Sequence, residues 1–142
     1  MAKRTLQLDV AYDFDFELIS IVSAERDYRL CWLLNRDFKL DFKRQEEIPI
    51  HYAKKKKYAY FNLYYFEDEL NWLQYYFINN KSQGESLIPE LKQVDYLLLI
   101  KGGEADSFKD EIMQGLNRMN QVQAILDTNP EHLSSKYNLI FE

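Results

Sequence analysis

The strongest constraint on the fold is a run of aromatic residues at positions 58–77, which holds ten of the 22 Tyr, Phe and Trp residues of the chain. Aromatic side chains favour extended strands, and their half-alternating order is typical of a β-hairpin. The mostly polar segment from Glu67 to Asn71 predicts its turn. We therefore expect two antiparallel strands in this segment.

The length of this turn decides which aromatic side chains share a face. A five-residue turn pairs Phe66 with Trp72 and predicts a core face of Phe61, Leu63, Tyr65, Leu73, Tyr75 and Phe77. The opposite face, which we expect to be a surface, then carries Tyr58, Tyr60, Asn62, Tyr64, Phe66, Trp72, Gln74 and Tyr76. A four-residue turn would shift the register by one and mix the two sets.

Other segments also have strand patterns. Apolar residues occupy every even position from Leu6 to Leu18, which predicts a long strand bent near Asp13 and Asp15, or two consecutive strands. Residues 94–101 are apolar on nearly both faces, as expected for a central strand. A further strand is expected over residues 121–127.

A weaker extended segment covers residues 40–52. Pro49 predicts an edge position for it, because proline cannot donate a hydrogen bond to a neighbouring strand.

Two segments have helical periodicity. The first covers about residues 24–38, with Ser23 as its N-cap and an apolar arc of Tyr28, Cys31, Trp32, Leu34 and Phe38. The second covers about residues 106–119, with Asp106 or Ser107 as its cap. Gly115 lies on its apolar stripe, which predicts a close contact between helix and sheet.

The order of these elements predicts an α+β fold in a single domain over residues 1–142. We expect an antiparallel-rich sheet with an aromatic hairpin, covered by two main helices. The C-terminal strand, helix and strand form a βαβ-type unit, as in ferredoxin-like or ACT-like modules, and an intervening strand between its two strands is equally consistent.

Composition and charge limit the class of protein. Hydrophobic residues make up 46% and charged residues 29%, which excludes disordered and collagen-like chains. The net charge of −5 disfavours nucleic acid as a partner. The sequence contains one cysteine, no long apolar run and no signal-peptide pattern, so we expect a cytoplasmic protein without a membrane span.

One segment carries a family resemblance. Residues 88–96 read IPELKQVDY, and the residues Ile88, Pro89, Glu90, Val94, Asp95 and Tyr96 resemble the signature of a bacterial family named after that pattern, IPExxxVDY. The DYRLCW segment at 27–32 and the NKS segment within 79–82 are also similar. The resemblance implies no activity, cofactor or catalytic residue, and a structural role for the motif is the favoured interpretation.

Basic side chains and a glycine turn are the candidates for anion binding. Arg26, Arg29 and Arg36 share one helical face, and a lysine run follows at 54–57. Gly102 and Gly103 lie between a predicted strand and a predicted helix, where backbone N–H groups can bind an anion. For both features the ordinary structural role, a solvated face and a tight turn, is favoured.

Metal binding and catalysis have weaker support. The acidic residues Asp9, Asp13, Asp15 and Glu17 share a predicted strand face, but a solvated face explains them better than a cation site. His51, His132 and Cys31 belong to no recognisable catalytic pattern. We therefore predict no metal, no cofactor and no catalytic residue, and a non-enzymatic protein is the favoured class.

These observations favour an interaction module, most simply a homodimer joined through the tyrosine-rich face or an edge strand. The candidate interface residues are Tyr60, Tyr64, Trp72 and Tyr76. The alternative is an ACT-like sensor of a small anion or metabolite. Binding of single-stranded RNA comes third, because lysines accompany the tyrosines but no RNP-type motif is present.

Overall fold

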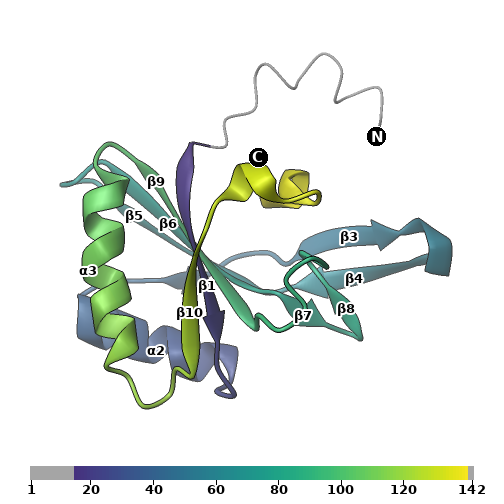
Figure 1. Ribbon diagram of the computed structural model, residues 1–142, viewed down its shortest axis with the longest axis horizontal. Helices are drawn as coiled ribbons and strands as arrows, with labels where there is room; N and C mark the ends of the chain where they lie inside the picture. The colour runs from purple at the N-terminus through teal and green to yellow at the C-terminus, as the bar shows by residue number, and fades with distance from the viewer. Residues whose placement is uncertain (1–14, 141–142) are drawn as a thin grey trace.

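The computed structural model describes residues 15–140 and has the expected α+β architecture (Figure 1). Its helices are α2 (Asp27–Phe38) and α3 (Ala105–Asn117), with short 3-10 turns η1 (Ala53–Lys55), η2 (Pro130–His132) and η3 (Lys136–Leu139). Its strands are β1 (Phe16–Val22), β2 (Lys43–Arg44), β3 (Ile48–Tyr52), β4 (Lys57–Phe61), β5 (Leu63–Asp68), β6 (Leu73–Asn79), β7 (Lys81–Ser82), β8 (Glu85–Ser86), β9 (Tyr96–Gly102) and β10 (Ala124–Thr128).

The main sheet has six strands in the order β10-β1-β9-β6-β5-β2, and all neighbours are antiparallel. Strand β1 lies between β9 and β10, so the C-terminal βαβ unit is the split form with an intervening strand. The elements β1, α2, β6, β9, α3 and β10 follow ferredoxin-like topology. The predicted central position of β9 is confirmed.

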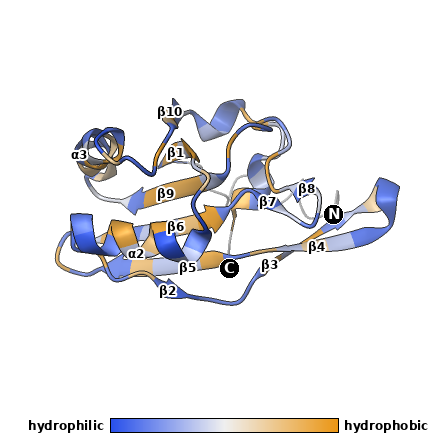
Figure 2. Ribbon diagram, turned by 90° about the horizontal axis from the view of Figure 1, so that it is seen from below, coloured by the Kyte–Doolittle hydropathy of each residue, from blue (hydrophilic) through white to orange (hydrophobic). Residues whose placement is uncertain are grey.

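The sheet has a core on each face (Figure 2). Both helices pack on one face, where Ile19, Ile21, Phe77, Leu98 and Ile100 meet the buried sides of α2 and α3. The other face is covered by the β3–β4 hairpin, residues 87–94 and the C-terminal turns. Because both faces are covered, β1 and β9 are apolar on both sides, as their sequences indicated.

In the aromatic hairpin, the preferred five-residue turn is wrong, and the structure has the four-residue alternative. Strand β4 pairs with β3, and only β5 and β6 form the expected hairpin. Its turn holds four residues, 69–72, and pairs Asp68 with Leu73 and Phe66 with Tyr75. The Asp68 carboxylate accepts hydrogen bonds from the backbone N–H and side-chain amide of Asn71, which closes the turn one residue later than predicted.

The first helix begins later and faces differently than predicted. Ser23 is not its N-cap: the Ser23 hydroxyl accepts from the Glu25 N–H (3.1 Å) and donates to the Gln121 carbonyl, so it closes a turn before the helix. Tyr28 and Trp32 lie on the exposed side, and the buried residues of α2 are Leu30, Cys31, Leu33 and Leu34. This arc is more aliphatic than the predicted one.

The second helix starts at Ala105 with Glu104 as its N-cap, so neither Asp106 nor Ser107 caps it. A Cβ atom on Gly115 would overlap the ring of Phe38 in α2. The close contact at Gly115 is therefore between the two helices, and the predicted contact with the sheet is wrong. The last strand covers residues 124–128 rather than 121–127.

Residues 6–14, which carry most of the alternating N-terminal pattern, lie outside the described residues, as does the bend predicted near Asp13. Pro49 lies in β3, which among the described residues pairs with β4 alone, so its predicted edge position is confirmed there.

Candidate functional site

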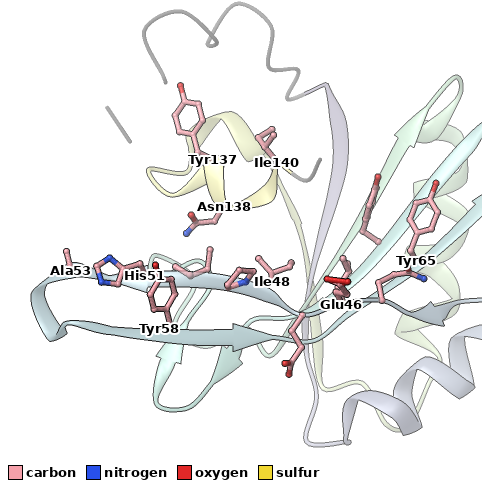
Figure 3. Close-up of a pocket in the computed structure, with 15 residues that line it drawn as sticks. Glu46, Ile48, His51, Ala53, Tyr58, Tyr65, Tyr137, Asn138 and Ile140 are labelled. Carbon is pink, nitrogen blue, oxygen red and sulfur yellow. The ribbon is translucent and has the colours of Figure 1, made fainter. Parts of the chain in front are cut away.

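The candidate site is an open groove of about 1230 Å³ beside β3 (Figure 3). Strand β3 forms one wall, and Tyr137, Asn138 and Ile140 of the C-terminal segment lie across from it. Leu63, Tyr65 and Tyr76 of the main sheet also line the groove. The remaining lining residues are Gln45, Glu46, Glu47, Ile48, Pro49, Ile50, His51, Ala53 and Tyr58.

Within residues 15–140, no strand pairs with the outer edge of β3. The Tyr60 N–H donates to the Gln83 side chain (2.8 Å), and the Tyr60 carbonyl accepts from the Ser82 hydroxyl (2.7 Å). Tyr60 therefore turns its backbone away from Pro49, its partner in β3. Because antiparallel pairs alternate, His51 and Tyr58 also form a pair without backbone hydrogen bonds. The Pro49 carbonyl and both backbone groups of His51 thus point away from β4.

We call the β3–β4 hairpin the arm. The exposed face of the arm carries stacked aromatic rings. The His51 and Tyr58 rings lie 4.8 Å apart, and the Tyr58 and Tyr60 rings lie 6.4 Å apart with 22° between their planes. Tyr58 and Tyr60 are 55% and 44% exposed. This exposed aromatic ladder is available for contacts outside the chain.

The two ends of the arm carry opposite charge. Lys54, Lys55 and Lys56 are exposed at its tip, where Lys55 also pairs with Glu85 (2.9 Å). Glu46 and Glu47 are exposed where β3 begins.

The four predicted interface residues do not share one face. Tyr64 is in the helix-side core, where burial, followed by the Asp27 carboxylate, raises the pKa of its hydroxyl to about 12. Tyr76 is half-buried on the opposite face and lines the groove. Tyr60 is on the arm, and Trp72 is 82% exposed in the β5–β6 turn. The correction follows from the register of β5 and β6.

Two of the predicted anion-binding arginines, Arg29 and Arg36, have structural partners of their own. The guanidinium groups of Arg29 and Arg36 lie over the Trp32 ring, at 5.4 and 5.1 Å, and Arg36 also pairs with Asp37 (2.8 Å). Arg26 is the N-cap residue of α2. Gly102 pairs with Leu73 at the end of β9, against the Trp72 carbonyl, and Gly103 is exposed in the turn that follows.

The IPExxxVDY segment is held by Asn80, a fully buried residue that no periodic sequence pattern marked. Its side-chain amide donates to the carbonyls of Leu91 and Val94, both at 2.9 Å, and its side-chain oxygen accepts from the Ile88 N–H at 2.8 Å. The segment therefore bends around one amide side chain. A signal for it was the NKS similarity noted at 79–82.

The acidic and aromatic residues of the same segment make further contacts. Burial favours a higher pKa for Glu90, but hydrogen bonds from the hydroxyl and N–H of Ser135 lower it below its usual value. Asp95 accepts from the Ser23 N–H (2.9 Å) and pairs with Lys81 (3.1 Å), and the Tyr96 hydroxyl donates to the Glu25 carbonyl. Ile88 and Val94 are buried, whereas Pro89 is exposed. These contacts favour a structural role for the motif.

Within residues 15–140, no three His, Cys, Asp or Glu residues gather in a way that could hold a metal ion. Of the acidic cluster, Asp9 and Asp13 lie outside the described residues, and Glu17 pairs with Lys109 at 2.9 Å. His132 lies in η2, on a different element from His51 in β3.

Cys31 is expected to be unreactive in the folded protein. Burial, followed by the Asp27 charge, raises the pKa of its thiol to about 12, so the thiol stays protonated at pH 8. Labelling with a thiol-specific disulfide reagent at pH 8 is expected to be at least about 100-fold slower than that of free cysteine. The same sample in concentrated urea should react at once, and equal rates in both states would contradict the prediction.

No helix among the described residues is both long and apolar enough to cross a membrane. Comparisons with protein-family models, with curated proteins and with solved structures find no match to this chain. The resemblance to the IPExxxVDY family accordingly stays a prediction.

Proposed function

We propose that this protein is an interaction module that binds an extended protein segment in the groove beside β3. The observation that carries the proposal is the outer edge of β3, where the Pro49 carbonyl and both backbone groups of His51 point away from β4. An added strand can hydrogen-bond to such an edge, and pockets beside it then select side chains.

The residues around this edge suit a protein ligand. Tyr65 and Tyr76 present rings to the groove, and tyrosine is enriched at protein interfaces because it combines apolar area with a polar tip. Glu46 and Glu47 line the same groove and disfavour a phosphate-rich ligand there. The buried, protonated Cys31 is compatible with a reducing compartment, and we place the protein in the cytoplasm.

The test is a selection of displayed random peptides of about ten residues, long enough to cover the edge of one strand. Selected peptides are expected to bind the native protein and the His51→Ala variant, which keeps the backbone N–H. They should lose binding to His51→Pro, which, unlike His51→Ala, also removes the outward N–H of that residue. Equal binding to both variants, or no enrichment against the native protein, would contradict strand addition at β3.

A further inference from the structure

We infer that the segment added to β3 is β3 of a second copy of this chain, paired antiparallel about a two-fold axis at His51. This inference rests on the proposed function and names its partner. The sequence predicted a homodimer joined either through the tyrosine-rich face or through an edge strand. This inference is the edge-strand alternative.

Backbone hydrogen bonding selects this register. With the axis at His51, its N–H donates to the carbonyl of His51 of the partner subunit, and the reverse bond follows by symmetry. Pro49 then faces Ala53 of the partner subunit. Ala53 begins η1 and has no intrahelical partner for its N–H, so it can donate to the Pro49 carbonyl.

Proline on an edge strand normally discourages pairing, because one donor is absent. In this register the absent donor is not needed: the group opposite Pro49 is the Ala53 carbonyl, which already accepts the Lys56 N–H at 3.2 Å. Shifting the register to place Pro49 opposite His51 would leave the His51 carbonyl unpaired. The pairing centred on His51 therefore gives a partner to both backbone groups of His51 and to the Pro49 carbonyl, whereas the shifted pairing leaves the His51 carbonyl without a donor.

Charge complementarity supports the same arrangement. With the axis at His51, the tip of one arm, residues 53–56, lies near residues 46–49 of the partner subunit, although the 3-10 turn of the tip ends the strand register at Ala53. The side chains of Lys55, Lys56, Glu46 and Glu47 are exposed on the isolated chain. The two-fold axis repeats the set, so the lysine tip of each arm lies along the acidic start of the other.

The shape of the molecule keeps both helices away from this pairing. In both ribbon views the arm extends away from the two helices, and its tip projects beyond the rest of the described chain (Figures 1 and 2). Two arms can therefore meet without the helices colliding. The dimer would continue the ladder of Tyr58 and His51 across four strands, since the two rings are neighbours within each arm.

The experiment is sedimentation velocity over a range of concentrations at near-physiological ionic strength. The native protein should form a species of twice 17.1 kDa. His51→Pro is expected to raise the dimer Kd about 10- to 100-fold, because it removes both central N–H donors, whereas His51→Ala should change it little. Circular dichroism of both variants checks that the arm is folded.

Charge and cross-linking variants test the register. The pair Lys55→Glu with Lys56→Glu should weaken the dimer, and adding Glu46→Lys with Glu47→Lys should restore it. His51→Cys should form a disulfide-linked dimer with oxidised glutathione, because directly opposed residues have Cα atoms about 5.5 Å apart. Tyr60→Cys, on the other strand of the arm, should not.

The outcomes separate the two proposals. A protein that stays monomeric but still selects peptides in a manner sensitive to His51→Pro overturns the homodimer and leaves the proposed function standing. A dimer that is indifferent to His51→Pro and does not cross-link through His51→Cys forms elsewhere, which also overturns this inference. Failure of both peptide selection and dimerisation removes both proposals.

Discussion

Replacing Asn80 by alanine is expected to lower the free energy of unfolding by about 3 to 5 kcal/mol, since each buried backbone group left without a partner costs about 1 to 3 kcal/mol. Three such groups depend on this one side chain: the Ile88 N–H and the carbonyls of Leu91 and Val94. Asn80 is fully buried, so water cannot replace the lost bonds without opening the segment. A loss of this size is a large part of the stability of a typical domain.

Urea unfolding followed by far-ultraviolet circular dichroism measures the loss. Asn79→Ala is the matched control, because the neighbouring side chain has a buried oxygen with no partner among the described residues. Removing that oxygen should change the free energy of unfolding by less than about 1 kcal/mol. Similar losses for the two variants would show that Asn80 does not hold residues 88–94 as the hydrogen bonds indicate.

Replacing Gly102 by alanine is expected to lower the free energy of unfolding by about 3 kcal/mol, from backbone strain and a steric overlap together. Gly102 has a φ of +115°, in the region that favours glycine, and it pairs with Leu73 at the end of β9. An added Cβ atom would overlap the Trp72 carbonyl oxygen and contact the Leu73 Cα at 3.3 Å. Both neighbours are backbone, so neither can move aside cheaply.

Gly103→Ala is the control for this prediction, because a Cβ atom there meets nothing within 4 Å. It should change the thermal midpoint by no more than a few degrees, as expected for an exposed position away from special contacts. Scanning calorimetry of the two variants makes the comparison. If Gly103→Ala is the more destabilising of the two, the steric explanation for Gly102 is wrong. Anion binding by the turn should then be tested directly.

The sequence was informative where one local pattern decides the outcome. The doubly apolar run at 94–101 predicted the central strand, and Pro49 predicted an edge. The split βαβ unit was left open, because local periodicity does not show which strand lies between β9 and β10. That choice depends on pairing with β1, which is remote in the sequence.

The aromatic faces were not predictable in the same way. A difference of one residue in the turn length decides whether Tyr64 faces the helices or the solvent. The hydrogen bonds between Asp68 and Asn71 stabilise the four-residue turn, which places Tyr64 toward the helices. Likewise, the hydropathy of Trp32 predicts a core residue, yet its side chain is exposed and lies between Arg29 and Arg36. Cation–π contacts stabilise an exposed indole, and no periodicity rule includes them.

The candidate site was predicted only in part. Pro49 predicted an edge strand, whereas His51 was considered only for catalysis, where it fits no recognisable pattern. The groove also needs the C-terminal segment, which reaches β3 through the fold and not through the sequence. Asn80 was missed because a polar residue after an apolar strand reads as the start of a loop until its partners are known.

The position of β1 between β9 and β10 sets the time at which the protein can fold during synthesis. Phe16 pairs with Lys101, and Val22 pairs with Ala124, so both neighbours of β1 are translated long after it. At about 5 to 20 residues per second, the ribosome needs roughly 5 to 20 seconds to make the residues in between. A strand apolar on both faces must wait unpaired for that time, which makes the nascent chain a natural client of chaperones that shield exposed apolar segments.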